Sequence, residues 1–153
     1  MKPEHMTADA APSRMLEKPT WLISQAFSRS SRLLAEAFEA AGARGYHYRL
    51  LAALEEFGPS SQADLGRRTS IDRSDVVAAL NELADQGLVQ RSADPEDRRR
   101  NIITITPAGK DRLRRLERIV RGVQERLLAP LSTADRARFI RLLTRVAQHE
   151  ARP

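Results

Sequence analysis

Residues 91–109 read RSADPEDRRRNIITITPAG, and this stretch decides the fold. A loop of Asp, Pro and Arg residues separates LVQR (88–91) from NIITIT (101–106), two segments whose β-branched or alternating residues favour strands. The pattern therefore predicts a two-stranded β-hairpin. Thr106 and Pro107 then provide an N-cap and a proline at the first helical position, so we expect a helix to follow the hairpin directly.

Three helices are expected immediately before the hairpin. The first covers 46–57 and ends at Gly58-Pro59, because glycine favours a left-handed cap and proline cannot continue a helix. Ser61 and Asp72 each precede an acidic residue three positions later, which is the spacing of a capping box at the start of a helix. The helix that begins at Asp72 is expected to end at Gly87. Its buried side is predicted to be Val76, Val77, Leu80 and Leu83, which leaves Arg73, Ser74 and Asn81 exposed.

Longer amphipathic helices are predicted on both sides of this region, at 19–42 and within 107–150. Spacings of three and four residues alternate in the second region and predict a narrow apolar seam that packs on another helix. The seam is Leu113, Leu116, Val120, Val123 and Leu127. A last helix is expected to begin at Ser132 and to bury Phe139, Leu142, Leu143 and Val146.

Two helices joined by the short turn 69–71, with a hairpin directly after the second, fit a winged helix-turn-helix within residues 45–110. The predicted fold class is therefore mainly α with a small β-hairpin wing and flanking dimerisation helices. In this architecture the second helix enters the major groove of DNA, and helix starts hold backbone phosphates. The candidate DNA-binding residues are Ser61, Gln62, Arg67, Arg68, Arg73, Ser74, Arg91, Arg98, Arg99 and Arg100.

Three consecutive arginines, at 98–100, mark the tip of the predicted wing. We expect Asp94 or Asp97 to pair with one of them and to leave the others directed outward. An outward arginine fits the narrow, strongly negative minor groove, while its neighbours neutralise phosphates. Residues 61–110 carry 8 basic and 8 acidic groups, so DNA binding requires several acids to face away. These acids are Glu82, Asp85, Asp94 and Glu96.

The composition of the 153 residues predicts one soluble globular domain at 19–153, preceded by a mobile N-terminal tail at 1–18. The net charge of +6 arises from residues 111–153, which carry 11 basic and 5 acidic groups, so charge alone does not identify the binding face. The absence of cysteine and the wide spacing of three histidines predict no metal and no cofactor. Without an apolar run of about 18 residues or a signal peptide, we expect a cytoplasmic protein.

The runs SQADLGRRTSIDRSDVVAALNELADQGLV (61–89) and DPEDRRRNIITITPAG (94–109) resemble the winged helix-turn-helix of the MarR (multiple antibiotic resistance regulator) family. The resemblance extends over about residues 20–150. It implies a homodimeric transcription regulator, typically a repressor, whose dimer interface is formed by the helices at 19–42 and 107–150. It also implies a pseudo-palindromic operator in double-stranded DNA and release from that DNA by a small anionic or phenolic ligand.

The same resemblance implies a ligand cleft between the dimer helices and the DNA-binding lobe. The candidate ligand residues are Trp21, Tyr46, His47 and Arg49. In the urate-sensing branch a tryptophan of the first helix works with an acid of the second helix, but Arg49 stands at that position here. This difference argues against urate and favours an anionic effector such as a carboxylate. The simpler interpretation of Trp21 is a packing or interface residue.

Two other functions compete with DNA-binding regulation. The first is a winged-helix module that binds another protein without specific DNA binding, which the balanced charge of residues 61–110 permits. The second is an enzyme. The sequence contains no cysteine, no Gly-rich phosphate loop and no convincing carboxylate pair, so we expect no catalytic activity.

Overall fold

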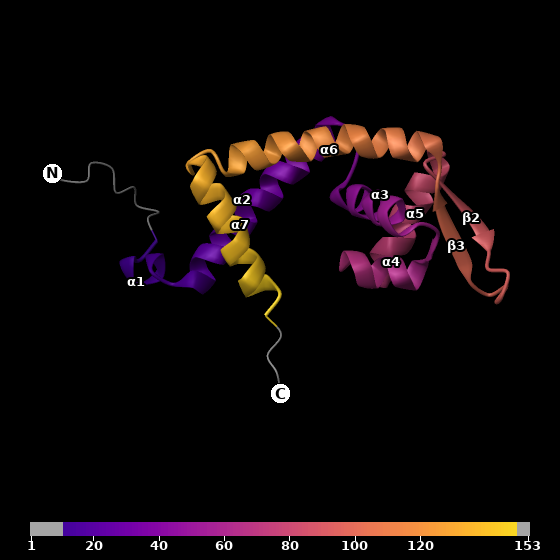
Figure 1. Cartoon of the computed structure of the whole chain (residues 1–153), viewed down its shortest axis with the longest axis horizontal. Coiled ribbons are helices and arrows are strands. Elements are labelled where there is room, and N and C mark those ends of the chain that lie inside the picture. The colour runs from indigo at the N-terminus through magenta and orange to yellow at the C-terminus, as the bar shows by residue number, and fades with distance from the viewer. Residues whose placement is uncertain (1–10, 150–153) are drawn as a thin grey trace.

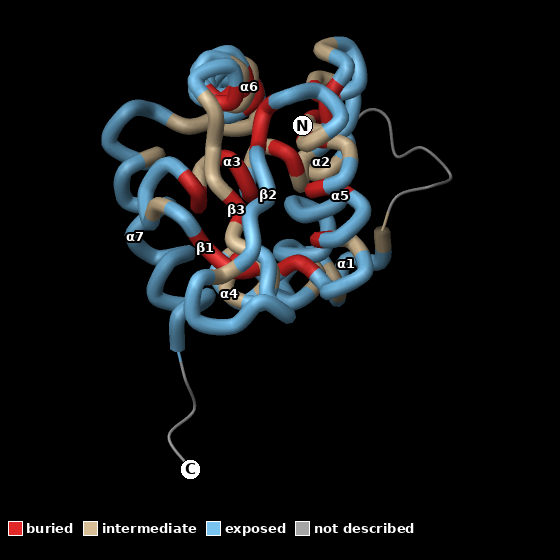
Figure 2. Tube along the Cα trace, turned by 90° about the vertical axis from the view of Figure 1, so that its right-hand side faces the viewer, coloured by how far each residue is buried: buried red, intermediate tan, exposed pale blue. Residues whose placement is uncertain are grey.

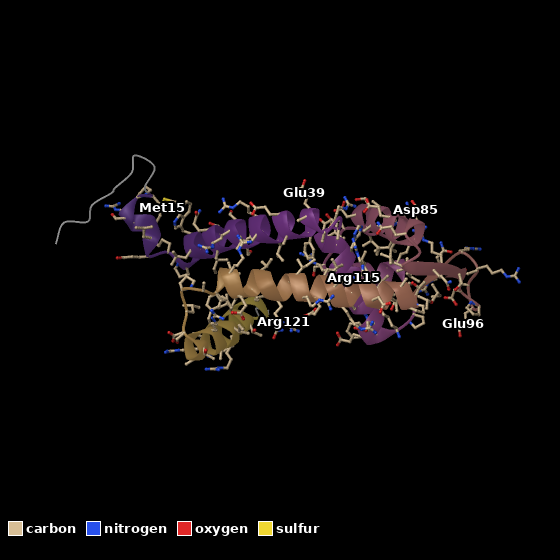
Figure 3. All side chains as sticks on the ribbon, turned by 90° about the horizontal axis from the view of Figure 1, so that it is seen from above. Met15, Glu39, Asp85, Glu96, Arg115 and Arg121 are labelled. Carbon is tan, nitrogen blue, oxygen red and sulfur yellow. The ribbon has the colours of Figure 1, made fainter. Side chains whose placement is uncertain are left out.

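The computed structural model describes residues 11–149 and is mainly helical with one small sheet. The long helix α6 (Pro107–Leu127) spans the molecule beside α2 (Pro19–Ala40), as two perpendicular views show (Figures 1 and 3). Helix α7 (Thr133–Ala147) lies at the same end of the molecule as the start of α2, and most of the remaining elements lie under the opposite end of α6 (Figure 1). Within residues 11–149 no helix is long and apolar enough to cross a membrane. The remaining elements are α1 (Ser13–Leu16), α3 (Gly45–Phe57), β1 (Ser60–Ser61), α4 (Gln62–Thr69), α5 (Arg73–Asp85), β2 (Val89–Ala93) and β3 (Asn101–Ile105).

The helix starts follow the capping residues of the sequence at three of four predicted positions. Ser61, Thr106 and Ser132 each accept a hydrogen bond from the backbone N–H three residues later. At the fourth position the prediction is wrong in its mechanism. Asp72 occupies the N-cap of α5, but its side chain makes no capping hydrogen bond. The end of α5 agrees with the prediction, because Gly87 has a positive φ of 69° just beyond the helix.

The core lies where α3, α4 and α5 meet the first half of α6, among the buried segments drawn in red in Figure 2. Leu50, Leu65 and Leu80 are fully buried there. The predicted buried side of α5 needs one correction, since Val77 is 37% exposed and Ala79 is buried instead. Positions 76, 79, 80 and 83 follow the spacing of one helical stripe, and position 77 lies outside it.

The sheet has three strands in the order β1-β3-β2, so the predicted two-stranded hairpin was incomplete. Ser60 and Ser61 of β1 pair antiparallel with Ile103 and Ile102 of β3. Serines carry no β-branched signal, which is why the sequence did not reveal this strand. Both side chains are buried without loss of hydrogen bonds, because Ser60 Oγ donates to the Gly58 carbonyl at 2.9 Å and Ser61 Oγ donates to Asp64 at 2.9 Å.

Two further expectations about the chain ends differ from the structure. Residues 13–16 form the short helix α1 within the segment predicted as a mobile tail, and residues 1–10 of that tail lie outside the described residues. The apolar residues of α7 were expected to be buried, but Phe139, Leu142, Leu143 and Val146 are 38% to 62% exposed. The reason is geometric, because no other element of the described chain covers this face of α7.

Candidate nucleic-acid interface

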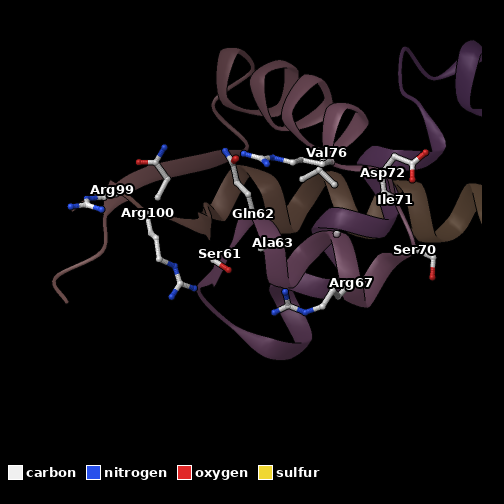
Figure 4. Close-up of a pocket in the computed structure, with 13 residues that line it drawn as sticks. Ser61, Gln62, Ala63, Arg67, Ser70, Ile71, Asp72, Val76, Arg99 and Arg100 are labelled. Carbon is white, nitrogen blue, oxygen red and sulfur yellow. The ribbon is translucent and has the colours of Figure 1, made fainter. Parts of the chain in front are cut away.

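An open groove of about 870 Å³ lies between α4, the start of α5 and the wing (Figure 4). Four arginines from three separate stretches of sequence line it: Arg67, Arg73, Arg99 and Arg100. Arg100 extends toward the start of α4, whereas Arg99 points away from it (Figure 4). The other lining residues are Ser61, Gln62, Ala63, Gly66, Ser70, Ile71, Asp72, Val76 and Asn101. The fold therefore gathers basic side chains that the sequence separates by about thirty positions.

Arg73 begins the second helix of the helix-turn-helix, with Ser74 next to it. Both residues are exposed, and neither side chain forms a hydrogen bond or ion pair within residues 11–149. The turn before them is tight, since Ser70 adopts a left-handed conformation with φ 54°. This turn directs the start of α5 outward, so both side chains are available to a ligand.

The start of α4 is less open than the sequence suggested. Ser61 is 5% exposed, and its hydroxyl serves the capping interaction with Asp64. Arg67 forms an ion pair with the same Asp64. Gln62 is half-buried and lines the groove. Of these predicted residues, Gln62 and the exposed Arg67 side chain can reach an external partner, whereas Ser61 has a structural role.

The acids of the wing turn do not pair with its arginines, which corrects the prediction for Asp94 and Asp97. Asp94 Oδ1 accepts the backbone N–H of Glu96, and Asp97 Oδ1 accepts that of Arg99, both at 3.0 Å. Short aspartate side chains satisfy nearby backbone donors in this way and stabilise turns. The guanidinium groups of residues 98–100 consequently have no side-chain partner within the described residues, and all three are exposed.

Three predicted DNA-binding arginines, Arg68, Arg91 and Arg98, lie outside the groove lining, and the first two have contacts of their own. The guanidinium carbon of Arg68 stacks 3.9 Å from the centre of the Phe57 ring, and that ring is itself 51% exposed. Arg91 Nη2 donates to Asn81 Oδ1 at 2.6 Å, so Asn81 is not the free side chain that the sequence suggested. In contrast, Asn101 lines the groove and was missed by the sequence analysis, although it directly follows the wing arginines.

The candidate ligand residue His47 is a buried structural residue. Its Nδ1 accepts the backbone N–H of Arg44 at 3.3 Å, so Nε2 carries the proton and donates to Glu82 at 2.6 Å. Glu82 also accepts from Arg44 at 2.7 Å. These bonds join the start of α3 to α5. They also give Glu82 two side-chain partners, while the expectation that it faces away from DNA stays a prediction.

Tyr46 and Arg49 lie together on α3, whereas Trp21 lies elsewhere. The Arg49 guanidinium is 5.8 Å from the centre of the Tyr46 ring and donates to the Thr69 carbonyl at 3.4 Å. Tyr46 donates to Asp75 at 3.4 Å. Trp21 belongs to the first turn of α2, the end of that helix far from α3 (Figure 1). One protomer therefore does not bring the four predicted ligand residues into a single site.

A hydrogen bond joins α3 to the long helix α6. Tyr48 of α3 donates to Glu117 Oε2 at 2.6 Å. Partial burial, together with the hydrogen bond and negative charge of Glu117, raises the pKa of Tyr48 to about 12. A hollow of about 590 Å³ lies beside this pair, between α3 and α6, and none of the predicted ligand residues lines it. Residues 11–149 contain no group of three His, Cys, Asp or Glu side chains placed to hold a metal ion.

Known proteins show the same fold over nearly the whole chain. A probable transcriptional regulator from Pseudomonas aeruginosa has a crystal structure with a TM-score of 0.78 and 32% identity, covering 87% of this chain and 99% of its own. The PcaV regulator of Streptomyces coelicolor, solved in complex with its natural ligand, has a TM-score of 0.74 and 26% identity over 90% of this chain and 97% of its own.

Sequence relatives agree with the structural neighbours. The transcriptional repressor NicR of Pseudomonas putida is 27% identical over 144 residues, which cover 94% of this chain and 91% of NicR. A putative regulator of the hcr operon from Thauera aromatica is 34% identical over 104 residues, 68% of this chain but only 63% of that protein. A model of the MarR family matches residues 43–100. The chain is a winged helix-turn-helix transcription regulator and belongs to the MarR family.

Proposed function

We propose that the protein binds a specific DNA operator as a homodimeric repressor, with α5 in the major groove and the wing along the adjacent minor groove. The observation that carries this proposal is the groove between α4, α5 and the wing. Three of its four arginines have no side-chain partner within the described residues. For the two in the wing, the reason is that the wing acids bind backbone amides instead. Unpaired guanidiniums on one face provide the charge that phosphates require.

The side chains of this face divide into two roles. Arg73 and Ser74 lie at the exposed start of α5, from which a recognition helix reaches base edges. Arg98–Arg100 and Arg67 lie to either side and suit phosphates or the minor groove. The proposal therefore assigns sequence specificity mainly to Arg73 and most of the electrostatic affinity to the wing.

Fluorescence anisotropy across a salt series tests this division, with a duplex selected from the source genome and a scrambled duplex. Arg73→Ala should cost about 1–3 kcal/mol on the selected duplex and reduce discrimination. Arg99→Ala should weaken both duplexes equally and reduce the slope of log affinity against log salt by about 1. Arg115→Ala, on the exposed side of α6 away from the groove, is the matched control and should change neither (Figure 3).

Two outcomes would contradict the proposal. Equal losses for Arg73→Ala and Arg99→Ala on both duplexes would remove the assignment of specificity to Arg73. Failure of the wild-type protein to bind any duplex at low salt would reject DNA binding altogether and select the protein-interaction module in its place.

Dimerisation is proposed through the exposed apolar side chains at the end of the molecule formed by α2 and α7. An apolar surface of this kind in one chain is typical of a subunit interface. Two reading units related by twofold symmetry then bind half-sites about one helical turn apart, roughly 34 Å. Sedimentation equilibrium should give twice the chain mass. The exposed side chains are Leu22, Ile23, Phe27, Phe139, Ile140, Leu142, Leu143 and Val146.

Release of the repressor is proposed to require a small anionic ligand that binds at Arg49. The related regulator PcaV was solved with its natural ligand. In the present chain the Arg49 side chain is exposed, and its one hydrogen bond, to the Thr69 carbonyl, is long at 3.4 Å, so an anionic ligand can replace it. Calorimetry with a panel of aromatic carboxylates tests this site on wild-type protein, Arg49→Ala and the control Arg115→Ala. Unchanged affinity for Arg49→Ala would remove Arg49 from the effector site. The proposal includes no catalytic step.

A further inference from the structure

The outer half of the wing leaves the hydrophobic core. In β2 only Val89 is buried, whereas residues 90–93 are exposed. Its partner β3 contributes Ile103 as the only fully buried residue between 101 and 105. Figure 2 shows the outer part of β2 and the following turn as exposed. Apolar packing therefore fixes the base of the wing but leaves the direction of its tip weakly determined.

One side-chain contact bridges this exposed part of the wing to a helix. Arg91, which pairs with Ile103 in the sheet, reaches across to α5 and donates to Asn81 Oδ1 at 2.6 Å. Within the described part of the chain, no other side-chain hydrogen bond or ion pair links residues 90–101 to a helix. Beyond the apolar base of the wing and the backbone pairing of β3 with β1, this is therefore the one side-chain contact within residues 11–149 that sets the direction of the wing relative to α5.

The chemistry of this contact also fixes the amide of Asn81. A guanidinium has only donors, so the atom that Asn81 presents to Arg91 must be its oxygen. The amide NH₂ group then faces the other way. Asn81 lies two helical turns after Arg73, at positions separated by multiples of four, and therefore on the same exposed side of α5.

We infer that Arg91 is a positioning residue, which holds the wing against the recognition helix through Asn81, and that it is not a phosphate contact. This inference rests on the proposed DNA binding and revises the role predicted for Arg91 from the sequence. It has a consequence for specificity, because a bidentate contact to adenine requires both the oxygen and the NH₂ group of an asparagine. With its oxygen held toward Arg91, Asn81 is left to present its NH₂ group to DNA, where it can donate to a phosphate or to acceptors such as those of guanine.

A double-mutant cycle in DNA affinity distinguishes positioning from direct contact. Asn81→Ala and Arg91→Ala should each weaken binding by about two- to ten-fold, the size of one net hydrogen bond. The double variant should lose no more than the more weakly binding single variant, and the slope of log affinity against log salt should stay at the wild-type value. Gln90→Ala, at the exposed neighbouring position of β2, is the control and should bind as wild type. Two results would overturn the inference. One is wild-type DNA affinity in Asn81→Ala together with a salt slope reduced by about 1 in Arg91→Ala, and the other is a double variant whose loss of affinity equals the sum of the two single losses.

Hydrogen–deuterium exchange of the free protein provides a readout that needs no DNA. Both Asn81→Ala and Arg91→Ala should accelerate exchange at residues 92–100, and Gln90→Ala should not. Unchanged exchange in both variants would overturn the positioning role, whatever the DNA results. If the wild-type protein binds no duplex, the proposed function fails, and the exchange data still decide whether Arg91 holds the wing.

Discussion

Replacement of Gly109 by alanine should uncouple the wing from α6. Gly109 lies in the first turn of α6, where its N–H donates to Thr106 Oγ1 at 3.0 Å. A Cβ built there would lie 2.1 Å from the Leu88 carbonyl oxygen and 2.8 Å from Ile105 Cγ1. That carbonyl oxygen belongs to the backbone at the base of the wing and also accepts the Thr106 N–H at 3.1 Å. The methyl group therefore cannot be accommodated unless α6 and the wing base separate.

The magnitude follows from two opposing effects. Overpacking of a tight site costs about 1–3 kcal/mol, and this contact is shorter than any normal one. Alanine gains about 1 kcal/mol over glycine in a helix interior, but a position in the first turn realises only part of that gain. Displacement of the Leu88 carbonyl also weakens the hydrogen bond from Thr106, which contributes about 1 kcal/mol. The free energy of unfolding should therefore fall by about 2 kcal/mol.

Urea denaturation at a fixed protein concentration measures this change, with Lys110→Ala as the control. Lys110 is the exposed neighbour in the same helical turn, so its replacement should stay within about 0.5 kcal/mol of wild type. Anisotropy should show that Gly109→Ala also weakens DNA binding, because the wing shifts. A denaturation midpoint for Gly109→Ala equal to that of Lys110→Ala would refute the close approach between α6 and the wing base.

Three further predictions concern other contacts. Tyr46→Phe leaves Tyr48 as the only tyrosine, and its absorbance titration should have a midpoint near pH 12; a midpoint near pH 10 would contradict the hydrogen bond to Glu117. Because the folded-state pKa of Tyr48 lies above the unfolded value of 10.0, its contribution to the free energy of unfolding is complete below pH 10 and is lost as the pH rises toward 12. In urea denaturation, Tyr48→Phe should remove this loss of stability. His47→Ala should lower the free energy of unfolding by about 2–4 kcal/mol, since it removes a buried side chain and its bond to Glu82; an unchanged stability with weaker effector binding would restore the predicted ligand role. Arg68→Ala should weaken DNA binding, and Phe57→Ala should weaken it to the same extent, because the ring holds the guanidinium in place to contact phosphate. Wild-type DNA affinity in Phe57→Ala would exclude this role for the ring.

Local signals in the sequence predicted the helices well. Ser61, Thr106 and Ser132 cap their helices as expected, because an N-cap depends on residues only three positions apart. The order of elements then identified the winged helix-turn-helix, and the groove arginines Arg73 and Arg99 lie on one face as the predicted architecture requires. Properties that depend on short-range spacing and element order are therefore accessible from one sequence.

Contacts between distant segments were not accessible in the same way. The pairing of β1 with β3 joins serines without strand preference to a strand about forty residues later. The bonds of Glu82 to Arg44 and His47, and of Arg91 to Asn81, likewise depend on how α5 lies against its neighbours. In the wing, Asp94 had two partners within reach, an arginine or a backbone amide, and the sequence could not indicate that the turn geometry favours the amide.

The apolar face of α7 shows how a prediction about burial can be wrong for one chain and still inform on assembly. Arg136 holds the corner between α6 and α7, since its Nε donates to the carbonyls of Leu128 and Leu131 at 3.1 Å and its Nη1 pairs with Glu125 at 2.6 Å. With α7 held at this corner, its apolar side chains stay exposed within the described chain. A second chain can cover them, which is the proposed dimer. Leu143→Arg should therefore yield a folded monomer with weakened operator binding, and a variant that sediments as a dimer would show that this face serves another partner.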